Sequence, residues 1–143
     1  MPVLSDNDRA DVWAAFMRAT PTPGATKPQL RAAIDAADNW IESHFADFQA
    51  AIPEPIRPTP SAETLLANAA AIAGSKAIAD VAAGVANRDQ SGVLLQAYNV
   101  ASAWLTINAA NYLTAVGTAA GGTLTQAQSF GVLEAVARRK AVV

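Results

Sequence analysis

The stretch TKPQLRAAIDAADNWIESHFADFQAAI, residues 26–52, carries the signals of one long amphipathic helix. Thr26 can cap the helix, with Pro28 in the first turn and Gln29 three residues after the cap, which is the spacing of a capping box. Apolar residues then recur at intervals of three and four: Leu30, Ile34, Ala37, Ile41, Phe45, Phe48 and Ile52. Residues 26–52 are therefore predicted to form a helix that buries one face.

Three acidic residues, Asp35, Asp38 and Glu42, share another face of this helix. Their spacing suits a carboxylate metal site, but it also arises whenever the solvent-facing side of an amphipathic helix is acidic. No Glu-x-x-His motif occurs elsewhere in the chain, so the solvent-facing interpretation is favoured and no metal or cofactor is expected. His44 is the only histidine, and we expect it to be packed or solvated rather than to act as a base.

A shorter helix is predicted before this one. Ser5 can cap it, and Asp6 and Asp8 lie in the early turns, where the helix dipole favours negative charge. An apolar stripe follows at Val12, Trp13, Phe16 and Met17. The helix is expected to end before residues 20–24, TPTPG, because two prolines and a glycine oppose its continuation.

Proline occupies four of the eight positions in residues 53–60, PEPIRPTP, which predicts an extended segment. We divide the chain into an N-terminal amphipathic helical pair (1–55), a proline-rich spacer (56–60) and an alanine-rich helical region (61–143). Only six charged residues lie in residues 61–137, against thirteen in the first sixty. Such a weakly charged region is poorly suited to standing alone in water.

Three helices are predicted in the alanine-rich region. The first follows a cap at Ser61 or Thr59, reaches Val85 and is bent or broken near Gly74. A turn at 87–92 precedes a helix over 93–116, which the glycine-rich residues 117–122 should stop. Thr125 and Gln128 repeat the capping-box spacing and open the last helix. The fold is predicted to be all-α, a small bundle of about five helices.

Composition disfavours several classes of function. A net charge of −2 argues against nucleic acid as the main partner. The basic residues 138–140 could contact DNA or RNA, but favourable charge at a helix C-terminus is the preferred interpretation. The chain has no cysteine, and no nucleophile, base and orienting group can be assembled, so an enzyme is the least favoured class.

No secretory signal is expected at residues 1–11. A membrane helix at 93–120 is disfavoured because it would hold Gln96, Asn99, Asn108 and Asn111.

Aromatic residues are the main candidates for contacts with other subunits, since they contribute much of the energy of cores and interfaces alike. The candidates are Trp13, Phe16, Trp40, Tyr98, Trp104 and Tyr112. Small residues of the second half, including Gly74, Ala77, Gly84, Ala101 and Ala109, would permit close helix approach. The pattern leaves open whether these contacts form within one chain or between neighbouring chains.

Short motifs of the first half occur in a defined order: DR at 8–9, VWAAFMR at 12–18, TK at 26–27, LRAAIDAADNWI at 30–41 and FQAAIPEP at 48–55. In this order they resemble a family of small proteins that tailed bacteriophages and prophages encode, commonly among their structural genes. The ending, from Leu124-Thr125 to Arg138-Arg139, is similar to the usual ending of that family. This chain differs from the short members by about sixty alanine-rich residues before that ending.

The resemblance implies a non-enzymatic virion protein, made in the host cytoplasm and located in the capsid or at the head-to-tail junction. Its partners would be other virion subunits in an oligomeric assembly, bound through apolar helix faces. The alternative is a small intracellular regulatory or inhibitor protein that binds one protein partner through the acidic helix 26–52. A membrane-active lysis helper is a third, less favoured class, based only on residues 93–120.

Overall fold

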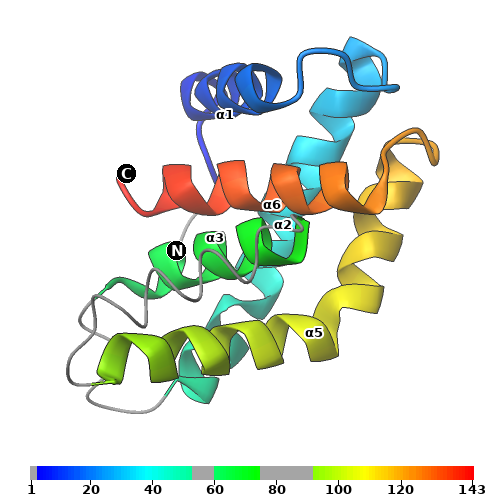
Figure 1. Ribbon diagram of the computed structural model, residues 1–143. Helices are drawn as coiled ribbons and strands as arrows, with labels where there is room; N and C mark the ends of the chain where they lie inside the picture. Colours follow the sequence, from blue (N-terminus) through cyan, green and yellow to red (C-terminus); the bar gives the residue numbers. More distant parts are fainter. Residues whose placement is uncertain (1–2, 53–59, 75–91) are drawn as a thin grey trace.

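The computed structural model describes residues 3–52, 60–74 and 92–143, and every regular element in these ranges is an α-helix (Figure 1). This confirms the predicted all-α fold. The helices are α1 (Asp6–Ala19), α2 (Lys27–Ala51), α3 (Ala62–Gly74), α5 (Val93–Ala119) and α6 (Gln126–Lys140). The predicted spacer lies outside the described residues, except for Pro60. The predicted continuation of the third helix beyond Gly74 and most of the predicted turn at 87–92 also lie outside them.

The predicted caps are confirmed. Ser5 accepts a hydrogen bond from the backbone N–H of Asp8, and both halves of a capping box are present at Thr26 with Gln29 and at Thr125 with Gln128. Before α3, Ser61 Oγ accepts from the backbone N–H of Thr64 at 3.2 Å. These bonds satisfy N–H groups that the first turn of a helix leaves without partners, which explains why the helices begin where they do.

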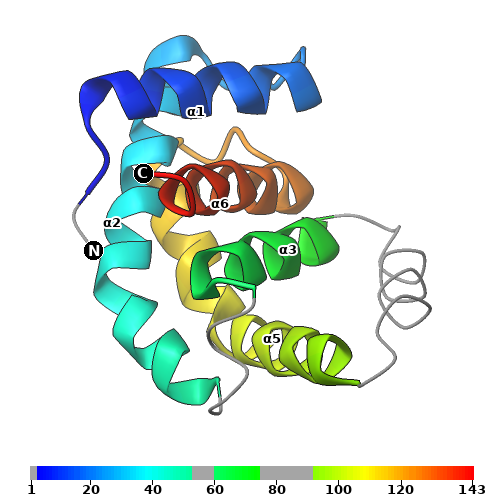
Figure 2. The ribbon, with the colours of Figure 1, turned by 90° about the vertical axis from the view of Figure 1, so that its left-hand side faces the viewer.

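The helices form a stack with one helix crossing it. Figures 1 and 2 show α1, α6, α3 and the first part of α5 lying one beside the next, while α2 runs across one side of this stack. Elements from the two halves of the chain therefore pack against each other, because α1 packs on α6 and α2 packs on both α5 and α6. The last turn of α6 consequently lies beside α1 and α2.

One hydrophobic core joins the two halves of the chain. It includes Phe16 of α1, Phe48 of α2, Leu65 of α3, Tyr112 of α5 and Leu133 of α6, each with an exposed fraction of 1% or less. The apolar faces predicted in the alanine-rich region are thus largely covered by helices of the same chain. Burial of this area is the main stabilising contribution to the fold.

Close approach of helices explains the small residues of the second half. A Cβ atom at Gly74 would lie 3.1 Å from the carbonyl oxygen of Ala127 and 3.2 Å from the Cβ of Phe130, so α3 and α6 meet at this glycine. Ala101 is fully buried and Ala109 is partly buried against the core. At Gly74 and Ala101 the contacts form within one chain, whereas Ala77 and Gly84 lie outside the described residues.

The helix α5 is longer than predicted, since it continues through Gly117 to Ala119. One glycine inside a helix costs only about 1 kcal/mol, and Val116 and Ala120 on either side are fully buried. The chain turns instead at Gly121 and Gly122, whose φ angles of 65° and 74° suit glycine.

Figure 1 also shows α5 bending part-way along its length. In this part of the helix, Thr106 Oγ1 donates a hydrogen bond to the carbonyl of Ser102, and Asn108 Nδ2 donates to the carbonyl of Trp104. Side chains that bond the carbonyl four residues earlier commonly bend a helix. The bend lets α5 follow α3 with its first part and reach the start of α6 with its last.

Candidate functional site

The six aromatic residues predicted as interface candidates divide into two groups by exposure. Phe16, Trp40, Trp104 and Tyr112 lie in the core, each with an exposed fraction of 7% or less. Trp13 and Tyr98 are only partly buried. Packing within this chain accounts for the four buried aromatics, so contact with another subunit stays a prediction for the remaining two.

The buried aromatics form a cluster at the centre of the core. The ring centroid of Trp40 lies 5.0 Å from that of Tyr112 and 5.7 Å from that of Trp104. Trp104 meets Phe48 edge-on at 5.0 Å, and Tyr112 stacks on Phe130 at 5.7 Å. Such pairs add stabilisation beyond the area they bury. The cluster therefore joins α2, α5 and α6.

Indole N–H groups in this cluster find acceptors on other helices. Trp40 Nε1 donates to Asn111 Oδ1 at 2.8 Å, and Trp104 Nε1 donates to Asp47 Oδ2 at 3.0 Å. His44 stacks on Trp40 with 4.3 Å between ring centroids, and its Nδ1 lies 2.7 Å from the carbonyl oxygen of Trp40. His44 is thus placed as a packing residue at the edge of the cluster.

The acidic face of α2 does not lie wholly in solvent as predicted. Asp38 has an exposed fraction of 1%, and its Oδ1 lies 2.6 Å from Nζ of Lys140, which is also buried. Lys140 pairs with Glu42 at 2.9 Å, and the backbone N–H of Leu4 donates to Asp38 Oδ2. A buried charge persists only where such partners replace water. The prediction for Asp38 was therefore wrong, because α6 covers this part of α2.

The neighbouring cation of α6 is also bound to another helix. Arg139 pairs with Asp8 at 2.7 Å and with Asp11 at 3.0 Å, both on α1. The predicted role of the basic residues 138–140, favourable charge at a helix C-terminus, is therefore incomplete, because Arg139 and Lys140 also connect α6 to α1 and α2.

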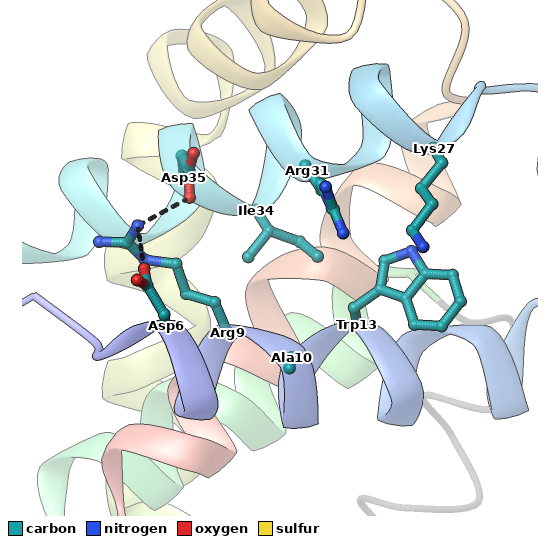
Figure 3. Close-up of a pocket in the computed structure, with 8 residues that line it drawn as sticks. All are labelled: Asp6, Arg9, Ala10, Trp13, Lys27, Arg31, Ile34 and Asp35. Carbon is teal, nitrogen blue, oxygen red and sulfur yellow. Dashed lines mark ion pairs between the residues drawn. The ribbon is translucent and has the colours of Figure 1, made fainter.

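A polar groove lies between α1 and α2. It has a volume of about 480 Å³ and is lined by Asp6, Arg9, Ala10, Trp13, Lys27, Arg31, Ile34 and Asp35 (Figure 3). Figure 3 shows Lys27 and Arg31 reaching from α2 toward Trp13 on α1, with Arg9 at the opposite end between Asp6 and Asp35. Three cationic and two acidic side chains thus line the groove together with the apolar residues Ala10 and Ile34.

Trp13 occupies an unusual position in this groove. The ammonium group of Lys27 lies 5.2 Å from the centroid of its indole ring, a distance at which a cation is attracted to the ring face. Its Nε1 is shielded from solvent and has no hydrogen-bond acceptor among the described residues. A shielded indole N–H usually has a partner, but Trp13 Nε1, like Arg9 Nε, is a donor of the groove that is buried without a hydrogen bond among the described residues.

The outward side of α5 forms a second surface of interest. The helix has no charged residue along its 27 positions. Its exposed residues include Gln96, Asn99, Ala103, Thr106, Ile107, Ala110 and Thr114, which follow one another at helical spacing. Ile107 is 82% exposed, the highest value among the large hydrophobic residues of the described part. We call these seven residues the α5 surface.

A cavity of about 430 Å³ lies between α5, α3 and the start of α6, and Asn99 and Thr106 of the α5 surface are among the residues that line it. Tyr98, Leu105 and Phe130 are among the residues that line it, so Tyr98 faces a concave apolar surface.

The described residues hold no group of three or more histidine, aspartate or glutamate side chains positioned to bind a metal ion. Likewise, none of the helices in the part of the chain that the structure describes has the length and apolar character that crossing a membrane requires.

No protein-family model matches the chain, and no curated protein or solved structure matches it significantly.

The groove between α1 and α2 was not predicted from the sequence, although Trp13 was among the interface candidates. Lys27 and Arg31 are spaced four residues apart on α2, which places them on one face, but the sequence does not say that α1 lies opposite. The burial of Lys140 also had no local signal, because its partner Asp38 belongs to a helix far away in the sequence.

Proposed function

We propose that this chain is a non-enzymatic bacteriophage virion protein, associated with the capsid or located at the head-to-tail junction, which binds neighbouring subunits. The proposal rests on the resemblance of residues 8–55 to small proteins of tailed phages, described above, and on the α5 surface. That surface is the observation that carries it, because a helix of 27 residues without a charge is unusual on the outside of a protein that works alone.

The α5 surface has the composition of a contact between subunits. Depletion of charge and an exposed apolar residue such as Ile107 are features of the central part of protein interfaces. Its amides and hydroxyls supply hydrogen bonds at the rim without the desolvation cost of charged groups. The apolar faces toward α2, α3 and α6 are already covered, so the partner would bind this outer side.

Incorporation into particles tests the proposal. Tagged chain is produced during phage growth, and particles are purified by density gradient and analysed by immunoblot. We expect the wild-type chain to co-sediment with the particles, and the Ile107→Glu variant to be lost from them, because it places a charge in the contact. Val142→Glu is the matched control, since Val142 is 72% exposed but lies beyond α6. Absence of the wild-type chain from particles contradicts the proposal.

A regulatory protein that binds a single soluble partner is the second candidate. Pull-down from infected cells separates the two functions, because one stoichiometric soluble partner, with no signal in particles, favours regulation. The acidic side of α2 offers less for this function than predicted, since Asp38 and Glu42 are held by Lys140, and of the three residues on that side only Asp35 stays half exposed.

A further inference from the structure

We propose that the groove between α1 and α2 binds a partner polypeptide segment in which an acidic side chain follows about three residues after a basic one. The acidic group would enter the end formed by Trp13, Lys27 and Arg31. This inference rests on the proposed function, since it names the chemistry of a partner subunit.

The two ends of the groove differ in how their charges are neutralised. Arg9 is surrounded by carboxylates, with Asp35 at 3.5 Å, Asp6 at 3.7 Å and Asp38 at 3.8 Å. Lys27 and Arg31 form no ion pair with any described residue. The end beside Trp13 therefore carries the uncompensated positive charge of the groove, and an anion is the group that complements it.

The unsatisfied N–H of Trp13 adds a hydrogen-bond donor to this end of the groove. An acceptor oxygen that enters this end would receive a hydrogen bond from Trp13 Nε1, which has no other acceptor, and would lie near the cations of Lys27 and Arg31. A carboxylate has two acceptor oxygens and matches the planar guanidinium of arginine. Ala10 and Ile34 line the same groove and would contact the methylene groups of a glutamate side chain.

The opposite end of the groove favours a polypeptide over a nucleic acid. Asp6 is fully exposed and Asp35 is about half exposed, and both line the groove. These carboxylates would repel a chain of phosphates, whereas they suit one basic side chain of a peptide. The groove is therefore complementary to a segment with one charge of each sign.

The length of the groove sets the spacing of those charges. From Asp6 to Trp13 the helix advances seven residues, or roughly 10 Å at about 1.5 Å per residue. A peptide in the polyproline II conformation covers that distance in about three residues at roughly 3.1 Å each, and its side chains three residues apart lie on the same side. A Lys-x-x-Glu segment thus places its lysine near Asp6 and its glutamate near Trp13.

Nuclear magnetic resonance of the indole N–H groups tests this inference directly on the full chain. The probe is a blocked Lys-Ala-Ala-Glu peptide, and Trp13→Phe assigns the resonance of Trp13. We expect the peptide to shift the Trp13 resonance in a saturable manner, while the buried Trp40 and Trp104 resonances stay in place. A Lys-Ala-Ala-Gln peptide should produce no such shift, because it lacks the carboxylate.

Charge reversal in the groove supplies the second readout. Arg31→Glu should weaken peptide binding by about tenfold or more, because it removes a cation and adds a repulsive charge. Arg18→Glu is the matched control, since Arg18 is exposed on α1 outside the groove. Unchanged Trp40 and Trp104 resonances establish that each variant is folded.

Three results would overturn the inference: no shift at millimolar peptide, an equal shift with the glutamine peptide, or an equal shift with inorganic phosphate alone. The outcome is separable from that of the proposed function. If the chain binds the peptide but is absent from particles, the virion role is refuted and peptide binding in the groove is supported. If the chain is incorporated normally but does not bind the peptide, the groove proposal is refuted and the virion role is supported.

Discussion

Lys140 Nζ lies 2.6 Å from Asp38 Oδ1, and neither side chain reaches solvent. The pair joins the last turn of α6 to the middle of α2 and thereby connects the two halves of the chain. Glu42 adds a second carboxylate 2.9 Å from Lys140, while Arg9 lies on the far side of Asp38. The stability of the fold should therefore depend on the last residues of α6.

Replacing Lys140 by methionine keeps most of the side-chain volume and removes the charge. We expect Lys140→Met to lower the free energy of unfolding by about 3–5 kcal/mol, because Asp38 is left buried without its closest cation. Urea denaturation measures the change. Arg138→Ala is the control, since its pair with Glu134 is half exposed and should contribute under about 1 kcal/mol. Similar losses in both variants would contradict this interpretation.

Removing the second charge should restore part of that loss. In the Lys140→Met background, Asp38→Asn replaces the unpaired carboxylate by a neutral amide, which can still accept the hydrogen bond from Leu4. A double-mutant cycle should give a coupling energy of about 1–3 kcal/mol. Additive effects of the two substitutions would show that the charges do not interact.

Close approach at Gly74 predicts opposite effects for two alanine substitutions. Gly74→Ala should destabilise the chain by about 1–3 kcal/mol, because its Cβ would lie within 3.2 Å of Ala127 O and Phe130 Cβ. Gly117→Ala should instead stabilise it by about 0.5–1 kcal/mol, since Gly117 is helical and a Cβ there meets no atom within 4 Å. Thermal denaturation of both variants checks the sign of each effect, and equal signs would be incompatible with the described packing.

Asp8 should contribute to the acid sensitivity of the fold. The Ser5 hydroxyl donates a hydrogen bond to Asp8, Arg139 pairs with it, and both hold the pKa of Asp8 below its ordinary value of 3.8. A carboxyl whose pKa is lower when folded stabilises the chain above the unfolded pKa, and this stability is lost as the pH falls through the folded pKa. Melting temperatures from neutral pH downward should fall less steeply for Asp8→Asn below about pH 4. Identical pH profiles would exclude this contribution.

Tyr112 should stay protonated for as long as the chain is folded. Burial raises the pKa of Tyr112 well above 10, and its hydroxyl donates to the carbonyl of Ser129. Because the folded pKa is raised, this group favours the folded state below its unfolded pKa and opposes folding as the pH rises above it. In Tyr98→Phe, Tyr112 is the only tyrosine left. Its phenolate absorbance should rise together with unfolding, and a rise before unfolding would contradict its burial.

Local features of the fold were predictable from the sequence, and distant contacts were not. Caps at Ser5, Thr26 and Thr125 depend on residues three positions apart, so spacing alone predicts them. The burial of Asp38 depends on α6, which the sequence places far away, and therefore appears only in the assembled fold. Aromatic candidates show the same limit, because Trp40 and Trp13 both suit a core or an interface by type, and only packing separates them.

Mass spectrometry of intact purified particles tests the virion role most directly, because it measures presence and copy number together. We expect the chain to be present in a fixed number of copies per particle, and we expect this number to drop for Ile107→Glu but not for Val142→Glu. Particles that assemble normally and contain none of the wild-type chain would contradict it.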